Sequence, residues 1–182
     1  MFQVRSFPTT IILSRRGAEL GRIVGYQAPE PFLRTVYAAM GRREPYDELV
    51  AEAASDPDDA EAQYLLGDMF LALGRFAEAR TAFDRVLDLD EANTTELADD
   101  AFLDRSLATY LAGFPAQAAA QLDEFVTRYP ASDRADQGLF FHGMFLIEAG
   151  EQSRGETKLR EAAARTSLDF IKNQAARLTA EE

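Results

Sequence analysis

Residues 64–83 have the sequence Tyr64-Leu-Leu-Gly67-Asp-Met-Phe70-Leu-Ala-Leu-Gly74-Arg-Phe76-Ala-Glu-Ala79-Arg-Thr-Ala-Phe83. Apolar side chains return every three to four positions on both sides of Gly74, which is the spacing of amphipathic helices. Glycine often ends a helix because it adopts the left-handed backbone conformation without strain. The segment therefore predicts two helices, at about 58–73 and 76–89, joined by a tight turn at Gly74.

The same pattern returns farther along the chain. Gly67 and Gly143 lie 76 residues apart, and a middle copy stands between them at Tyr110-Leu-Ala-Gly113-Phe114-Pro-Ala-Gln-Ala118. Self-similarity at a period of about 34 to 40 residues, with two helices per unit, is the signature of a helical solenoid. Further helices are predicted from Pro45 to the break at Asp56, and at about 96–112, 115–128, 133–149, 151–165 and 167–179.

This repeat resembles the tetratricopeptide repeat family. In the copy at about 60–93, residue types of the family stand at the family's spacings at Leu66, Gly67, Phe70, Gly74, Ala79 and Phe83. Small side chains at Gly67 and Ala79 let the paired helices approach closely, and the rings of Phe70 and Phe83 fill the space between repeats. The resemblance implies a mainly α, TPR-like right-handed helical solenoid that binds proteins in its concave groove.

Two further copies, at about 100–131 and 136–166, depart from the family pattern. Ser106 replaces the small glycine in the second copy, and Gly155 stands at the alanine position of the third. We expect the helix at about 167–179 to be the polar-faced cap that solenoids require. Residues 42–182 are therefore predicted to form one helical repeat domain.

The first 41 residues follow a different pattern. Residues 3–14 and 20–26 are rich in β-branched side chains, and a turn signal with Gly17 separates them. This arrangement predicts an antiparallel hairpin. Pro29 and Pro31 then open a predicted helix at about 30–40, because proline is tolerated in the first helical turn.

This N-terminal segment resembles the C-terminal third of a thioredoxin fold. Pro8 matches the position of that family's cis-proline, and Gly25 matches a glycine in the last strand before the final helix. The part of that fold with the Cys-x-x-Cys motif is missing. The resemblance leaves two alternatives, a C-terminal fragment of a longer thioredoxin–repeat redox or chaperone protein and a chain that has lost its redox half. It implies no activity for residues 1–41.

The composition excludes several classes of function. The net charge is −12 and the pI about 4.6, so a nucleic acid, whose phosphates such a surface repels, is a poor partner. The chain has no cysteine, which rules out disulfides, thiolate metal sites and cysteine nucleophiles within it. No apolar run approaches the ~20 residues of a membrane-spanning helix, and the N-terminus lacks a signal-peptide pattern. We expect a cytoplasmic protein, with a periplasmic location as the alternative.

Candidate catalytic and metal-binding residues form no recognised pattern. The one histidine, His142, has Leu146 four residues later, where a second metal ligand on the same helix face would stand. The acidic runs at residues 58–61 and 84–91 lack the loop pattern of a calcium site, and we interpret them as solvated helix faces. No Gly-rich phosphate loop or Gly-x-Ser-x-Gly motif is present. We therefore predict no enzyme activity, no cofactor and no metal.

The predicted binding surface is the concave groove, which the first helix of each pair lines in this family. The predicted groove residues are Tyr64, Asp68, Leu71, Asp104, Leu111, Phe140, Met144 and Ile147. Aromatic and methionine side chains suit an apolar peptide or helix, and the alternative for each residue is packing within the solenoid. The family's clamp for acidic tails needs basic side chains, whereas the first groove helix offers acidic ones such as Asp68. We therefore expect no acidic-tail ligand.

The hairpin carries apolar side chains on both faces, and the helix after it can cover one of them. We predict a homodimer in which two hairpins pair through Val4, Phe7, Ile11, Ile12 and Leu13. The leading interpretation of the chain is a non-catalytic protein–protein interaction scaffold. Two alternatives stay open, the thioredoxin-type fragment and a structural subunit of an envelope complex. The second rests on residues 125–132, which resemble the repeat of bacterial envelope-assembly lipoproteins.

Overall fold

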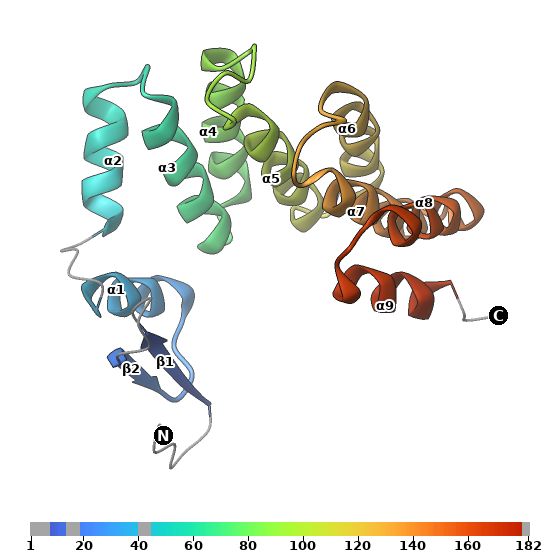
Figure 1. The fold of residues 1–182 in the computed structure, drawn as a ribbon. Coiled ribbons are helices and arrows are strands. Elements are labelled where there is room, and N and C mark those ends of the chain that lie inside the picture. Colours follow the sequence, from blue (N-terminus) through green and yellow to red (C-terminus); the bar gives the residue numbers. More distant parts are fainter. Residues whose placement is uncertain (1–7, 14–18, 40–44, 180–182) are drawn as a thin grey trace.

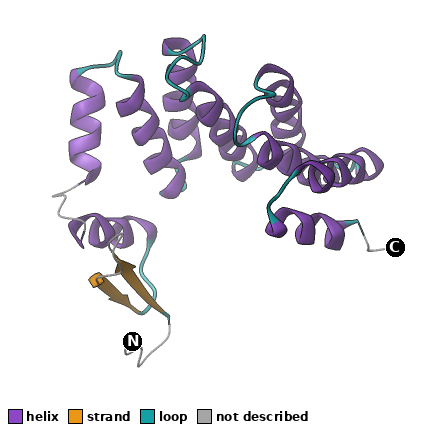
Figure 2. Ribbon diagram, in the orientation of Figure 1, coloured by secondary structure: helices purple, strands orange, loops and turns teal. Residues whose placement is uncertain are grey.

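The computed structural model describes residues 8–13, 19–39 and 45–179, in which two short strands precede a row of helices (Figure 1, Figure 2). The elements are β1 (Thr9–Leu13), β2 (Glu19–Val24), α1 (Pro29–Ala39), α2 (Pro45–Ser55), α3 (Ala60–Ala72), α4 (Phe76–Leu89), α5 (Ala98–Leu111), α6 (Pro115–Arg128), α7 (Ala135–Glu148), α8 (Gln152–Arg165) and α9 (Asp169–Leu178). The prediction of a mainly helical fold behind an N-terminal hairpin is confirmed.

Helices α3 to α8 form three consecutive pairs, and the turn inside each pair has the same construction. Gly74, Gly113 and Gly150 follow the first helix of the three pairs with φ of 74°, 91° and 86°, a left-handed conformation that glycine adopts without strain. The next residue then donates its N–H to a carbonyl five positions back, in the bonds Arg75 to Phe70, Phe114 to Thr109 and Glu151 to Leu146. This Schellman arrangement reverses the chain and packs the second helix of each pair against the first.

Close approach within the first pair depends on small residues, as the sequence predicts. A Cβ atom on Gly67 would lie 2.6 Å from Cε1 of Phe83, so the Phe83 ring occupies the space that a side chain would need. Phe83 and Ala79 are fully buried, in one apolar cluster with Phe70 and with Ala101 of α5. The cluster therefore spans the first pair and the start of the next. The close approach predicted at Gly67 is confirmed, but its neighbour is the Phe83 ring, which fills space inside the pair as well as toward α5.

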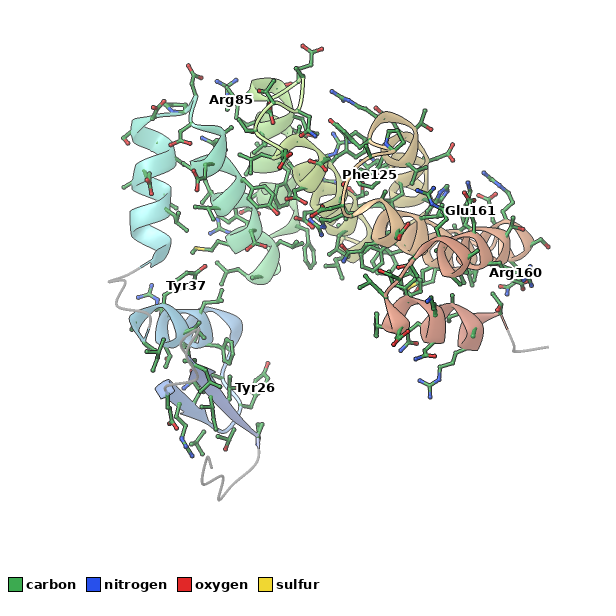
Figure 3. All side chains as sticks on the ribbon, in the orientation of Figure 1. Tyr26, Tyr37, Arg85, Phe125, Arg160 and Glu161 are labelled. Atoms are coloured by element: carbon green, nitrogen blue, oxygen red, sulfur yellow. The ribbon has the colours of Figure 1, made fainter. Side chains whose placement is uncertain are left out.

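Phe125 has the equivalent role farther along the row. Its ring is fully buried between α6 and α7, in the interior seen in Figure 3. A Cβ atom on Gly138 would lie 2.6 Å from Cδ1 of Phe125. Phe125 also packs against the rings of Phe102 on α5 and Tyr129 just after α6. The contact at Gly138 joins two pairs, whereas the contact at Gly67 lies within one. The same glycine–phenylalanine contact therefore occurs both within a pair and between pairs.

The N-terminal hairpin pairs β1 with β2 in antiparallel register, from Thr9 opposite Val24 to Leu13 opposite Glu19. Helix α1 covers one side of β2, because a Cβ atom on Gly21 would lie 2.6 Å from Cβ of Ala39. The strand–strand–helix order agrees with the prediction. The predicted domain boundary after residue 41 lies outside the described residues, and the handedness of the solenoid stays a prediction.

None of the described helices is both long enough and apolar enough to cross a membrane.

Candidate functional site

Side chains from α3, α5 and the start of α7 meet on one face of the row of pairs. The Tyr64 hydroxyl donates a hydrogen bond to Oδ2 of Asp104 at 2.8 Å. Arg134, the residue just before α7, donates to both oxygens of Asp104, at 2.8 and 3.1 Å. These bonds cross two repeat boundaries and join the first helices of three consecutive pairs. We call this surface, defined by Tyr64, Asp68, Asp100, Asp104 and Arg134, the inner face.

Arg134 is the cation at the centre of the inner face. Besides its two bonds to Asp104, it donates to Oδ1 of Asp100 at 3.1 Å and to Oε1 of Gln137 at 2.9 Å. Burial by itself lowers the pKa of Arg134, but the hydrogen bonds and charges of the two aspartates outweigh burial and hold that pKa above its ordinary value. The guanidinium therefore stays charged, and two carboxylates already match it.

The carboxylates of the inner face outnumber this cation. Loss of water around the carboxylate is the largest cause that raises the pKa of Asp100 above the ordinary value, and it does the same for Asp68, whose carboxylate is partly desolvated although the residue as a whole keeps an exposed surface. The charge of Asp104 raises both pKa values further. Asp68, on α3, is exposed. Three aspartates against one arginine leave the face with excess negative charge, which favours a partner with cationic side chains and repels an acidic one.

The apolar residues predicted for the groove differ in their exposure. Leu111, at the end of α5, is 45% exposed. The half-buried members are Leu71, Met144 and Ile147. Phe140 is buried, and its ring contacts Phe170 of α9 at 6.4 Å between centroids, so it belongs to the packing of α7 against α9. The predicted residues that the structure brings together are Tyr64, Asp68 and Asp104.

The predicted dimer residues lie on or before β1. Val4 and Phe7 fall outside the described residues. Ile11 and Ile12 are half-buried, and Leu13 is 44% exposed. The exposed apolar side chains of the hairpin segment therefore include Leu13, together with Leu20, Val24 and Tyr26. Tyr26 projects from the hairpin in Figure 3.

His142 is fully buried on α7. Its Nδ1 makes no hydrogen bond, because the nearest carboxylate oxygen, Oδ1 of Asp123, is 4.0 Å away. Burial is the largest cause that lowers the pKa of His142 below its ordinary value. In the part of the chain that the structure describes, no three histidine or carboxylate side chains are grouped so as to hold a metal ion. His142 is therefore best described as a neutral residue of the core.

Sequence reasoning missed Arg134, Asp100 and Gln137. Arg134 falls at the start of the predicted helix at about 133–149, but the structure places it just before α7, and only the packing of that pair on the one before brings it to α5. Asp100 and Asp104 are four residues apart and therefore share one face of α5. That spacing was a usable signal for a two-carboxylate site, but it did not identify the partner, which is 30 residues from Asp104 in the chain.

Comparison with protein families is consistent with this architecture. Residues 43–94 match the family model of the tetratricopeptide repeat. The match includes α3 and α4, the pair built on Gly67 and Phe83, and it ends before α5. Together with the helical architecture it supports a tetratricopeptide repeat protein. No curated protein matches the chain. The thioredoxin resemblance of the N-terminal segment stays a prediction.

Proposed function

We propose that the chain is a non-catalytic interaction scaffold whose inner face binds a segment of a protein partner. Tetratricopeptide repeats generally mediate protein–protein interaction. The observation that carries the proposal is the bonded row Tyr64–Asp104–Arg134, which joins α3, α5 and α7 across two repeat boundaries. A surface fixed in this way loses little conformational freedom on binding, so more of the contact energy remains as affinity.

The chemistry of the inner face favours a particular kind of segment. Asp68 is exposed, and within the described residues it forms no ion pair, whereas the charge of Arg134 is matched by Asp100 and Asp104. Leu111 adds an exposed apolar side chain at the end of α5. A partner segment that carries basic and apolar side chains complements this surface, and an acidic tail does not.

The test is site-specific photocrosslinking in the source cells. A photoreactive amino acid is placed singly at Asp68 or Leu111 on the first helices of their pairs, and at Thr81 or Glu124, exposed on the second helices, as matched controls. We expect one adduct of defined mass from the first two positions and none from the controls. Equal crosslinking from the control positions, or no adduct from any position, contradicts the proposal.

A charge-reversal variant sharpens the result. Asp68→Lys changes an exposed side chain, so the fold is retained, and we expect it to weaken binding of the captured partner at least tenfold. The control is Glu78→Lys, an exposed position on α4 outside the inner face. Equal affinities of the two variants exclude the inner face as the contact surface.

The N-terminal hairpin supports two further proposals. Exposed Leu13 and Val24 on a two-stranded sheet favour pairing with a second copy, because open strand edges and apolar faces are otherwise left to water. We expect light scattering at micromolar concentration to give the mass of a dimer, and Val24→Glu to give that of a monomer. A monomeric parent chain rules this homodimer out.

The alternative function is that of a thioredoxin-type redox or chaperone protein of which this chain is the C-terminal part. The observation that favours it is the hydrogen bond from the N–H of Gly25 to the carbonyl of Pro8 at 2.8 Å, since these are the two positions on which the resemblance rests. The intact mass of the endogenous protein after thiol alkylation tests it. A larger mass with two thiol adducts supports this function, and a mass near 20.2 kDa without adducts excludes it. Fractionation of the same cells tests the proposed cytoplasmic location against the periplasm.

A further inference from the structure

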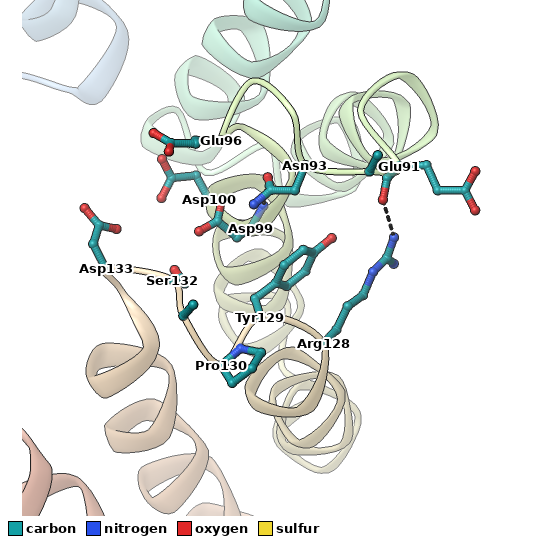
Figure 4. Close-up of a pocket in the computed structure, with 12 residues that line it drawn as sticks. Glu91, Asn93, Glu96, Asp99, Asp100, Arg128, Tyr129, Pro130, Ser132 and Asp133 are labelled. Carbon is teal, nitrogen blue, oxygen red and sulfur yellow. Dashed lines mark hydrogen bonds between the residues drawn. The ribbon is translucent and has the colours of Figure 1, made fainter.

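A cleft of about 630 Å³ lies between two inter-pair loops, the one from α4 to α5 and the one from α6 to α7 (Figure 4). Its polar lining residues are Glu91, Asn93, Glu96, Asp99, Asp100, Arg128, Tyr129, Ser132 and Asp133. The cleft thus lies beside the start of α5 and the end of α6, where the chain enters and leaves the second helix pair. Apart from Asp100, it shares no residue with the inner face.

Two buried polar groups of this cleft lack hydrogen-bond partners. Asp99 is 6% exposed, and its Oδ1 accepts no hydrogen bond. Tyr129 is 7% exposed, and its hydroxyl has no partner either. In Figure 4 the Tyr129 hydroxyl points toward the loop that carries Glu91 and Asn93. A buried polar group without a partner destabilises a fold, so a ligand that satisfies both groups stabilises this cleft.

The loop that forms one wall of the cleft is held in a defined shape. Asn93 has a φ of 52° and accepts hydrogen bonds at Oδ1 from the N–H groups of Ala98 and Asp99, which caps α5. Asp90, buried beside it, accepts hydrogen bonds from the backbone and hydroxyl groups of Thr94 and Thr95. The wall is therefore preorganised, and the cleft does not depend on an unconstrained loop.

The charges around the cleft favour a cation. Five carboxylates line it, Glu91, Glu96, Asp99, Asp100 and Asp133, and Asp100 is paired with Arg134. Arg128 is the lining cation, and its Nη2 donates to the Glu91 carbonyl at 3.2 Å while its guanidinium lies 5.2 Å from the centre of the Tyr129 ring.

The group that fits is an organic cation and not a metal ion. No three carboxylates in the described part of the chain are grouped so as to coordinate a metal. An ammonium or guanidinium group brings several N–H donors with one positive charge, so its chemistry suits a carboxylate oxygen and a hydroxyl oxygen that both lack partners. It also offsets part of the negative charge on the rim.

We propose that this cleft binds the ammonium or guanidinium group of an organic cation, with the Asp99 carboxylate and the Tyr129 hydroxyl as its acceptors. The cation comes from one of two sources, a basic side chain of a bound protein or a free small amine. The proposal does not depend on the inner face, because the acceptors lie in the cleft and not among the crosslinking positions described above.

The experiment is a titration of the isotope-labelled full chain followed by amide chemical shifts. The probes are spermidine, and a capped Ala-Lys-Ala peptide with its neutral counterpart in which norleucine replaces lysine. We expect the cationic probes to shift amides at residues 91–100 and 128–133, and the norleucine peptide to leave them unchanged. Tighter binding of spermidine than of the lysine peptide identifies a free amine as the source, and the reverse order identifies a protein side chain.

Variants separate the acceptors from general electrostatics. Asp99→Asn is expected to weaken binding of the cationic probe at least tenfold, and Tyr129→Phe about threefold. The matched control is Glu61→Gln, since Glu61 is the second residue of α3 as Asp99 is of α5 but is exposed. Equal affinity of the Asp99 and Glu61 variants, identical shifts with the norleucine peptide, or displacement of the probe by equimolar Ca²⁺ overturns the proposal. Because Tyr129→Phe removes no charge, it gives a result even if Asp99→Asn fails to fold.

Discussion

Replacing Arg134 by methionine tests whether the inner face is held together by its charged network. The guanidinium makes two bonds to Asp104, one to Asp100 and one to Gln137, whereas the apolar stem, which methionine retains, makes none of them. The side chain of Asp104 is 10% exposed, so the substitution leaves a largely buried carboxylate without its cation. Breaking a buried ion pair from one side costs about 3–5 kcal/mol.

The lower end of that range applies here for two reasons. The Tyr64 hydroxyl still donates to Asp104, and the side chain of Arg134 is 25% exposed, so water solvates part of the vacated site. We therefore expect Arg134→Met to lower the free energy of unfolding by about 3 kcal/mol. The measurement is urea unfolding followed by far-ultraviolet circular dichroism, with the slope of each transition compared to check that the variants unfold in the same way.

Two controls make the result specific to the network. Arg85→Met removes an exposed arginine that pairs with Asp58, and it should cost about 0.5 kcal/mol because exposed ion pairs contribute little. Adding Asp104→Asn to Arg134→Met removes the unmatched charge and should recover about 1 kcal/mol. If Arg134→Met destabilises no more than Arg85→Met, or if Asp104→Asn adds further loss, the inner face is not held by this network.

Two further predictions concern the core. Gly138→Ala places a methyl group against the buried Phe125 ring. It should lower the free energy of unfolding by about 1–2 kcal/mol, although alanine has the better helix propensity. Adding Phe125→Leu should recover part of this loss in the same urea assay. The pKa of His142 in the folded chain is lowered from its ordinary value of about 6.5. At a pH below that value the unfolded chain therefore binds a proton that the folded chain excludes, and the free energy of unfolding should fall as the pH decreases from 7.5 to 5.5. His142→Gln should flatten this dependence, and an unchanged slope would show that other groups cause it.

The helices and their pairing were predictable because their causes are local. Apolar spacing and the glycines at 74, 113 and 150 identify helices and turns within a few residues of chain. The need for a small residue at Gly67 was predicted, because the repeat pattern places it where the paired helices touch, but its contact with the Phe83 ring appeared only in the structure. The equivalent contact at Gly138 was not predicted, because it joins two pairs and depends on how one pair is set against the next.

The sites show the same division. Tyr64, Asp68 and Asp104 were assigned to one surface, because residues on the first helices of successive pairs share a face of a solenoid. Phe140 was assigned to that surface by the same rule, yet it packs against Phe170 of α9, whose position the repeat pattern does not specify. The exposure of a side chain depends on which other helix packs against it, and the spacing of apolar residues along the chain does not specify that helix.

The sequence by itself determined that this protein is a row of helix pairs behind an N-terminal hairpin, because propensity, apolar period and glycine turns act over a few residues. Only the tertiary structure decided that Arg134 neutralises Asp104 and that Asp99 and Tyr129 lie unpartnered in one cleft. Each of these relations joins residues that are about 30 positions apart in the chain. Whether a charged side chain finds a partner depends on how one helix pair packs on the next. The local sequence pattern does not specify that packing.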